Sequence, residues 1–258
     1  MRVLFVGDVV GPEAIGYLCG RLPELRREHR LDAIVVNAEN CGPTGVGMTV
    51  ASIERLLACG VDVITAGNHA FDGPESARAL AHPRVLRPLN LRDGVAGRGA
   101  MVVPAGDARL TVAVLADRDA MALVPALRDA FLPPYEGWLG APREGAVLVD
   151  FHAQSVMAKQ SFAHAVDGQA AAVLGTHTHE PTLSVDVLPG GTALVTEVGM
   201  TGARSGPQGF DPARFIALAR GVPRDAAPTP APARGPITLG AVFVEIERGR
   251  AVAVRRLR

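Results

Sequence analysis

The stretch Val3-Leu4-Phe5-Val6-Gly7-Asp8 is an apolar, strand-like run that ends just before an acidic residue. Four further apolar runs, at residues 34–36, 63–65, 147–149 and 172–174, are likewise followed within a few residues by polar side chains that can bind a metal. In open α/β sheets, ligands bind beyond the carboxyl ends of the strands. The sequence therefore predicts that these side chains converge on one rim of the fold. They are Asp8, Glu39, Asn40, Asn68, His152, His177 and His179.

The segment Gly175-Thr176-His177-Thr178-His179 places two imidazoles two residues apart. On an extended segment both side chains point to the same side, so both can reach one metal cluster. Two divalent cations held by two carboxylates and five neutral ligands leave a formal surplus of about two positive charges, which suits an anionic phosphoester. Mixed oxygen and imidazole ligation predicts two ions of manganese or iron, with zinc or magnesium as alternatives.

Each of these features has an ordinary structural explanation when it is taken alone. Asp8 could cap the helix that follows it, and Gly67-Asn68-His69 could be a loop turn. A lone His152 at the end of a strand is more often a hydrogen-bonded structural histidine than a ligand. Five such explanations would have to coincide at five strand ends, which favours the metal interpretation. Asn37 is interpreted as a turn residue and not as a ligand.

His69 directly follows Asn68, so two adjacent side chains would have difficulty binding one ion. An imidazole beside the cluster can instead stabilise phosphoryl oxygens or protonate the leaving alkoxide. His69 is therefore the predicted catalytic histidine. The remaining histidines, His29, His82 and His164, are expected at the surface.

Composition indicates an ordinary globular chain of 258 residues with 48% hydrophobic residues. Twenty-six basic residues balance 26 acidic ones, so no overall field would draw the chain to nucleic acid or to a membrane. Cys19, Cys41 and Cys59 fit neither a disulfide framework nor a zinc ribbon, which predicts a reducing compartment. The strand expected from Arg2 leaves no room for a signal peptide, and no apolar run could span a bilayer. We therefore expect a cytoplasmic protein.

Apolar runs alternate with amphipathic segments in the first half of the chain, which predicts βαβ units, and strands dominate the second half. A single domain over residues 1–258 is expected, with a Pro/Ala-rich surface linker at about 221–236 before a C-terminal hairpin. The expected helices are Pro12–His29, Thr49–Cys59, Pro74–Ala81 and Met121–Phe131. The expected late strands are Leu183–Leu188, Thr192–Thr196, Ile237–Ile246 and Val252–Leu257, with a turn at residues 189–191.

Five segments together resemble the YmdB-like branch of the calcineurin-like metallophosphoesterases. They are Gly7-Asp8-Val9-Val10-Gly11, Asn37-Ala38-Glu39-Asn40, Gly67-Asn68-His69-Ala70-Phe71-Asp72, Gly175-Thr176-His177-Thr178-His179 and Gly199-Met200-Thr201-Gly202. The resemblance extends from Met1 to about Gly206, and it is weak between about Val95 and Trp138. It implies a four-layer α/β/β/α sandwich, a dinuclear metal centre and phosphodiesterase activity on cyclic nucleotides of the 2′,3′-cyclic AMP type.

The same resemblance implies the ligand sets. Asp8, Glu39, Asn40 and His179 would hold one metal, and Glu39, Asn68, His152 and His177 the other. Glu39 would bridge the two ions, and His69 would be the catalytic histidine. The chain departs from the family after His152, where Ala153–Lys159 lacks the usual carboxylates, and at Glu197, where the family typically has Asp.

Two classes of function remain open. The favoured one is a phosphodiesterase in which metal-activated hydroxide attacks phosphorus and His69 acts as general acid on the departing oxygen. The other is a regulatory protein that binds a nucleotide or a protein and hydrolyses slowly. A phosphomonoesterase is the nearest enzymatic rival. The expected partner is a small phosphodiester or cyclic nucleotide, and a homo-oligomer is left open.

Overall fold

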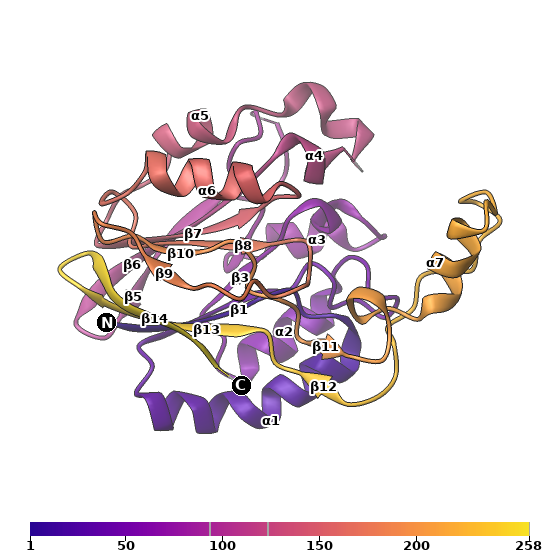
Figure 1. Ribbon diagram of the computed structural model, residues 1–258, viewed down its shortest axis with the longest axis horizontal. Coiled ribbons are helices and arrows are strands. Elements are labelled where there is room, and N and C mark those ends of the chain that lie inside the picture. The colour runs from indigo at the N-terminus through magenta and orange to yellow at the C-terminus, as the bar shows by residue number, and fades with distance from the viewer. Residues whose placement is uncertain (93, 123, 258) are drawn as a thin grey trace.

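Two six-stranded sheets pack face to face in the computed structural model, which describes residues 1–92, 94–122 and 124–257 (Figure 1). The first sheet has the order β14 (Arg250–Leu257), β13 (Ala241–Glu247), β1 (Arg2–Val6), β2 (Ala33–Asn37), β3 (Val63–Thr65), β4 (Val85–Leu86). The second has the order β5 (Ala100–Ala105), β6 (Ala108–Ala116), β7 (Ala146–His152), β8 (Ala172–Thr176), β10 (Ala193–Val195), β9 (Asp186–Val187). A small ribbon pairs β11 (Gly202–Ala203) with β12 (Ile237–Thr238).

Helices cover the outer face of each sheet. One buried cluster joins the first sheet to α1 (Gly11–His29), α2 (Val50–Ala58) and α3 (Ser76–Ala81). Another joins the second sheet to α5 (Pro134–Leu139) and α6 (Val156–Ala165). The protein is thus a four-layer α/β/β/α sandwich, as the family resemblance implied. No helix in the described parts of the chain is both long and apolar enough to cross a membrane.

The central strands are apolar along their whole length because both of their faces are buried. In β1, Leu4 and Val6 pack against the helical layer, while Val3 and Phe5 pack between the two sheets. This alternation follows the two-residue period of a strand. A run buried on both sides reads as continuously hydrophobic, and such runs are typical of parallel strands.

Parallel pairing brings the strand ends together. β1, β2, β3 and β4 run parallel in the first sheet, and β6, β7, β8 and β10 run parallel in the second. The antiparallel partners lie at the edges of the sheets, as the predicted hairpins β13–β14 and β9–β10 do. The polar residues that follow β1, β2, β3, β7 and β8 therefore leave the sheets at corresponding ends.

Three expected elements differ from the structure. The helix expected at Met121–Phe131 is wrong: α4 (Arg118–Met121) ends early, and a 3₁₀ segment, η2 (Pro125–Ala130), follows. Proline at position 125 has no N–H for an α-helical bond. Leu123, within the same expected helix, lies outside the described residues.

The other two are late strands that turn out shorter than expected. The strand at Leu183–Leu188 shrinks to β9, and Leu183 itself is fully exposed in the loop before it. The run Ile237–Ile246 divides into β12 and β13 at Gly240. The Gly240 carbonyl still accepts from Gly7 N–H in register with β1, but its own N–H bonds to the Thr201 hydroxyl, so the β1–β13 ladder ends there.

Beyond β11 the chain forms a projecting arm. After the 3₁₀ segment η3 (Pro207–Gly209), the short helix α7 (Pro212–Ala219) extends from the body (Figure 1) and has no buried residue. The segment 221–236 returns without helix or strand and bonds to residues 209 and 211 through Ala233 and Ala231.

The expectation of unpaired cysteines is wrong. Cys19 in α1 and Cys59 at the end of α2 form a disulfide across 40 residues of sequence. Their spacing does not reveal the pair, because it depends on how the two helices pack. The inference of a reducing compartment therefore loses the support of free cysteines. Cys41 remains a free thiol in the core.

We predict that the double substitution Cys19→Ser and Cys59→Ser lowers the free energy of unfolding by about 2–4 kcal/mol, because it releases a long loop in the unfolded chain. Denaturant titration monitored by circular dichroism measures the change. Metal content should stay constant, since the disulfide joins helices and not strand ends. Three titratable thiols in the unreduced, denatured native protein would contradict this pairing.

Candidate metal centre

Glu39 follows β2 and is completely buried. Its Oε2 accepts bonds from the backbone N–H groups of Gly67 (2.7 Å) and His69 (3.2 Å), so the loop after β3 fixes the carboxylate. Residue 67 must be small, because a Cβ there would lie 2.1 Å from the ring of His152. The other carboxylate oxygen, Oε1, has no hydrogen-bond partner among the described residues.

Four metal-competent atoms lie close together, one of them from Glu39 itself. The Nε2 atom of His152 lies 2.9 Å from Asn68 Oδ1, 3.0 Å from His177 Nδ1 and 3.3 Å from Glu39 Oε1. Glu39, His152 and His177 form a cluster whose ligand atoms all lie within 4.8 Å of one another.

Hydrogen bonds on the far side of each imidazole show which nitrogen faces the centre. The Thr176 hydroxyl donates to Asp150 (2.7 Å) and so accepts from Nδ1–H of His152 (2.9 Å), which leaves Nε2 as a lone pair. Nε2–H of His177 donates to the side-chain oxygen of Gln154 (3.0 Å), which leaves Nδ1 without a proton and with its lone pair toward the centre. The atoms that meet beside Glu39 are therefore all acceptors, and such a group repels itself unless a cation lies among them.

A second set of ligand-competent atoms comes from Asp8, Asn40 and His179. Nδ1–H of His179 donates to the Gln208 carbonyl (2.8 Å), and its Nε2 lies 3.7 Å from Asp8 Oδ1. Asp8 Oδ1 and Asn40 Oδ1 are buried and have no hydrogen-bond partner within the described ranges. The amide nitrogen of Asn40 donates to the Gly45 carbonyl (2.8 Å), which turns the oxygen away from that loop. Asp8 is not a helix cap, since Val10 occupies the N-cap position of α1.

Burial sets the ionisation tendencies of these groups. It raises the pKa of Glu39 well above its usual value, with a further contribution from Asp8, and it also raises the pKa of Asp8. Burial lowers the pKa of His152 and brings the pKa of His177 to about 4. Neutral imidazoles and carboxylates that lack a counter-charge are the electrostatic complement of divalent cations. These residues fit a metal centre.

Sequence reasoning missed a buried network behind His152. Asp150 lies two residues before His152 on β7 and accepts bonds from Thr176 and from the Asn37 amide (3.1 Å). Burial raises the pKa of Asp150 to about 7. Asn37 ends β2, and its Oδ1 accepts from the Glu39 backbone N–H (3.2 Å) as a turn residue does, while its amide also bonds across to the second sheet, a contact that the sequence did not predict. The Asp-x-His spacing on β7 was the available signal, since residues two apart share one face.

His69 lies beside the cluster and differs from the other histidines. Its Nδ1 contacts Asp72 Oδ2 at 2.6 Å, and its side chain is 24% exposed. A carboxylate at Nδ1 fixes the tautomer and leaves Nε2 as the reactive atom. Of the three histidines expected at the surface, His164 is exposed, whereas His29 and His82 are partly buried.

Cys41, adjacent to Asn40, packs within the apolar cluster that joins the first sheet to its helices. It is fully buried, and burial raises the pKa of its thiol to about 12. The oxygen and imidazole character of the ligand set is therefore unchanged.

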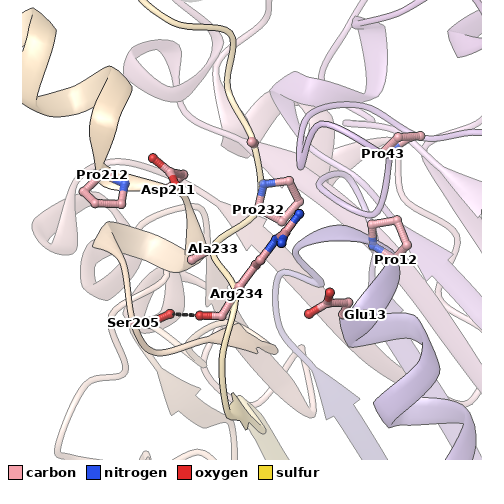
Figure 2. A pocket seen from close by; sticks show the side chains of 10 residues that line it. Pro12, Glu13, Pro43, Ser205, Asp211, Pro212, Pro232, Ala233 and Arg234 are labelled. Atoms are coloured by element: carbon pink, nitrogen blue, oxygen red, sulfur yellow. Dashed lines mark hydrogen bonds between the residues drawn. The ribbon is translucent and has the colours of Figure 1, made fainter.

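A groove of about 810 Å³ lies near this centre but does not contain it. Figure 2 shows it between the start of α1, with Pro12 and Glu13, and the returning segment with Pro232 and Arg234. None of the seven predicted ligands lines the groove, and neither does His69. Pro43, in the glycine-rich loop 42–47, lines this groove.

Comparison with known proteins gives close matches. The family model described as YmdB-like protein matches residues 4–257, well beyond the Gly206 limit expected from motifs. A 2′,3′-cyclic-nucleotide 2′-phosphodiesterase of Bacillus subtilis (strain 168) is 37% identical over 213 residues, covering 82% of this chain and 79% of that protein. A crystal structure of a hypothetical protein from Thermus thermophilus superposes with a TM-score of 0.88 at 36% identity, covering 98% and 97% of the two chains. One described as a novel phosphatase from Mycoplasma pneumoniae gives 0.87 at 28% identity, covering 99% and 92%.

We predict that Glu39→Gln lowers metal affinity, because a neutral amide supplies no charge to the ions. The loss should exceed the roughly 10–100-fold that follows removal of a residue that only hydrogen-bonds to a metal ligand. Elemental analysis after dialysis against limiting metal measures the ions per chain. Glu245→Gln, which removes a carboxylate from a surface ion pair with Arg2, is the matched control and should keep both ions. Two tightly held ions in the Glu39 variant would contradict its bridging position.

Proposed function

The chain belongs to the YmdB-like family of the calcineurin-like metallophosphoesterases, and we propose that it hydrolyses phosphodiester bonds of 2′,3′-cyclic nucleotides at a dinuclear metal centre. The observation that carries the proposal is the convergence of unprotonated acceptors on His152 Nε2, next to buried oxygens of Asp8, Glu39 and Asn40 that lack partners in the described chain. This donor set suits two divalent cations.

The proposed ligand sets follow the two groups of atoms. Asn68, His152 and His177 would hold one ion, and Asp8, Asn40 and His179 the other, with Glu39 shared between them. Manganese or iron is the proposed metal, since both accept mixed oxygen and imidazole ligands. When bound, the ions supply a nucleophile at neutral pH and offset charge on the phosphoryl group.

The protein's own residues supply orientation and exclude water. The backbone N–H groups of residues 67 and 69 hold one oxygen of Glu39 and aim the other at the cluster. Asp150, through Thr176, holds the tautomer of His152. A centre with about two surplus positive charges would attract an anionic diester and stabilise the charge that grows on it during hydrolysis.

His69 is the proposed proton donor to the leaving oxygen. Asp72 holds its Nδ1 at 2.6 Å, so the proton that moves is the one on Nε2. Ring opening of a 2′,3′-cyclic nucleotide releases a ribose oxygen that is a poor leaving group and needs this proton. Because His69 is partly exposed, it can reach a substrate that the buried ligands cannot contact directly.

The test is turnover of 2′,3′- and 3′,5′-cyclic nucleotides and of nucleoside monophosphates by purified protein, each with manganese, iron, zinc or magnesium. The proposal expects metal-dependent hydrolysis of the 2′,3′-cyclic substrates, with monoesters turned over more slowly. Faster turnover of monoesters would identify a phosphomonoesterase instead. Tight nucleotide binding with no turnover under any metal would favour the regulatory alternative.

We predict that His69→Ala retains both ions but slows hydrolysis by about 10²–10⁴-fold, as loss of a general acid does. The deficit should be largest for ribose esters and smaller for bis-p-nitrophenyl phosphate, whose leaving group needs little protonation. His164→Ala, in an exposed position on α6, is the control and should match the native rate.

Two results would revise this role of His69. Loss of an ion in the His69 variant would make it a ligand. An equal deficit for every leaving group would indicate stabilisation of phosphoryl charge and not proton transfer.

A further inference from the structure

The turn that carries His177 and His179 has an unfavourable backbone conformation. Both residues have positive φ, 98° and 64°, so the extended backbone expected for this segment is wrong. Only three other non-glycine residues in the described ranges have positive φ. A bulky residue with positive φ is strained, and such strain persists only where the surroundings over-determine the conformation. Something must hold this turn in place.

Glu197, just after β10, makes the contacts that could do so. It is buried, and its Oε2 accepts from the Thr178 backbone N–H (3.0 Å) and the Thr178 hydroxyl (2.6 Å). Its Oε1 accepts from the backbone N–H of Gly199 (3.1 Å). Thr178 is the residue between the two histidines, so one carboxylate grips the centre of the strained turn.

Lys159 of α6 completes the arrangement. It is 1% exposed, and its Nζ donates to Glu197 Oε2 (3.1 Å) and to the backbone carbonyl of Thr176 (2.9 Å). Gly175 allows the close approach, because a Cβ there would lie 2.1 Å from the Thr196 carbonyl and 2.9 Å from the Lys159 side chain. The ammonium thus holds the residue before His177, while its partner carboxylate holds the residue after it.

We propose that the buried pair Lys159–Glu197 is a positioning device that presents His177 and His179 to the metal centre. It acts through the backbone on either side of His177 and touches neither imidazole. A set of ligands binds an ion more tightly when the side chains are already oriented before the ion arrives, because less ordering is needed on binding.

A plain stabilising role explains the pair less well. A buried ion pair is weak evidence for stability, because desolvation of both charges offsets their attraction. Apart from their mutual contact, the hydrogen bonds that the two charged groups make among the described residues end on Thr176, Thr178 or Gly199, next to or within the turn that bears the ligands. The charges are thus placed where they constrain the histidines.

The test compares two carboxylates at opposite ends of the same strand. Glu197 follows β10, whereas Asp167 bonds to the backbone N–H groups of Gly190 and Thr192 just before it. Both carboxylates accept hydrogen bonds from backbone N–H groups, but only Glu197 bonds to the turn that carries His177 and His179. Manganese affinity by calorimetry and thermal stability of the metal-free protein are measured for Glu197→Gln and for the matched control Asp167→Asn.

The expected result for Glu197→Gln is a loss of metal affinity of about 10–100-fold, as for other outer partners of metal ligands. Asp167→Asn should lower thermal stability but leave the affinity within about threefold of the native value, since its turn carries no ligand. Glu197→Asp keeps the charge on a shorter side chain and should recover part of the affinity. An Asp variant no better than the Gln variant would contradict a role for the carboxylate.

Equal effects of Glu197→Gln and Asp167→Asn on manganese affinity would overturn the inference. If Glu197→Gln does not fold, the double variant Lys159→Met and Glu197→Gln replaces it, because it buries no unpaired charge; native affinity in that variant would also overturn the inference. The inference rests on the proposed metal centre and not on its substrate. A protein that binds two ions tightly but hydrolyses nothing would refute only the proposed activity, and one that binds none would refute both.

Discussion

The structure depends on the burial of four metal-competent atoms that face one another at a single point. His152 Nε2, His177 Nδ1, Asn68 Oδ1 and Glu39 Oε1 meet at the carboxyl ends of the strands, and each imidazole has its proton committed on its outer side. The negative partial charges of these atoms repel one another in a water-poor interior, so the fold brings them together at a cost in free energy. The rest of the architecture can be understood as the means of holding them.

Both sheets share this task. The first contributes Asp8, Glu39, Asn40 and Asn68, and the second contributes the three histidines, so the centre lies where the ends of the two sheets meet. The Asn37 amide crosses between the sheets to Asp150 and ties one set to the other (3.1 Å). Fixing each side chain on a strand end gives more precise geometry than flexible loops would, because strands are anchored by ladder hydrogen bonds along their length.

Local signals predicted an α/β fold and the placement of the candidate site residues, whereas the four-layer sandwich was implied by the family resemblance. A strand buried on both faces is apolar at every position, as Val3–Val6 shows, and the residue that follows it lies at a known end of the sheet. All seven candidate ligands could be placed by this rule. Their roles as ligands stay a proposal, since that assignment needs the ions themselves.

The structural features that were not predicted from the sequence depend on contacts between distant segments. The Cys19–Cys59 disulfide depends on how α1 and α2 pack, and the division at Gly240 depends on the bond from its N–H to the Thr201 hydroxyl. Asn37 and Asp150 look like a turn residue and an ordinary strand residue until the two sheets are brought together.

The residues that orient the candidate ligands are difficult to recognise from local sequence patterns. Metal-competent residues stand out in a sequence because few residue types bind metals, whereas the residues that aim them are chemically ordinary. Thr176, Gln154 and the Gln208 carbonyl each accept one imidazole proton, and of these three residues only Thr176 lies within a motif segment. His69 stands apart from these constraints, since Asp72 orients it from its own loop, three residues away. The proton transfer proposed for His69 requires access to the substrate, and its partial exposure allows that access.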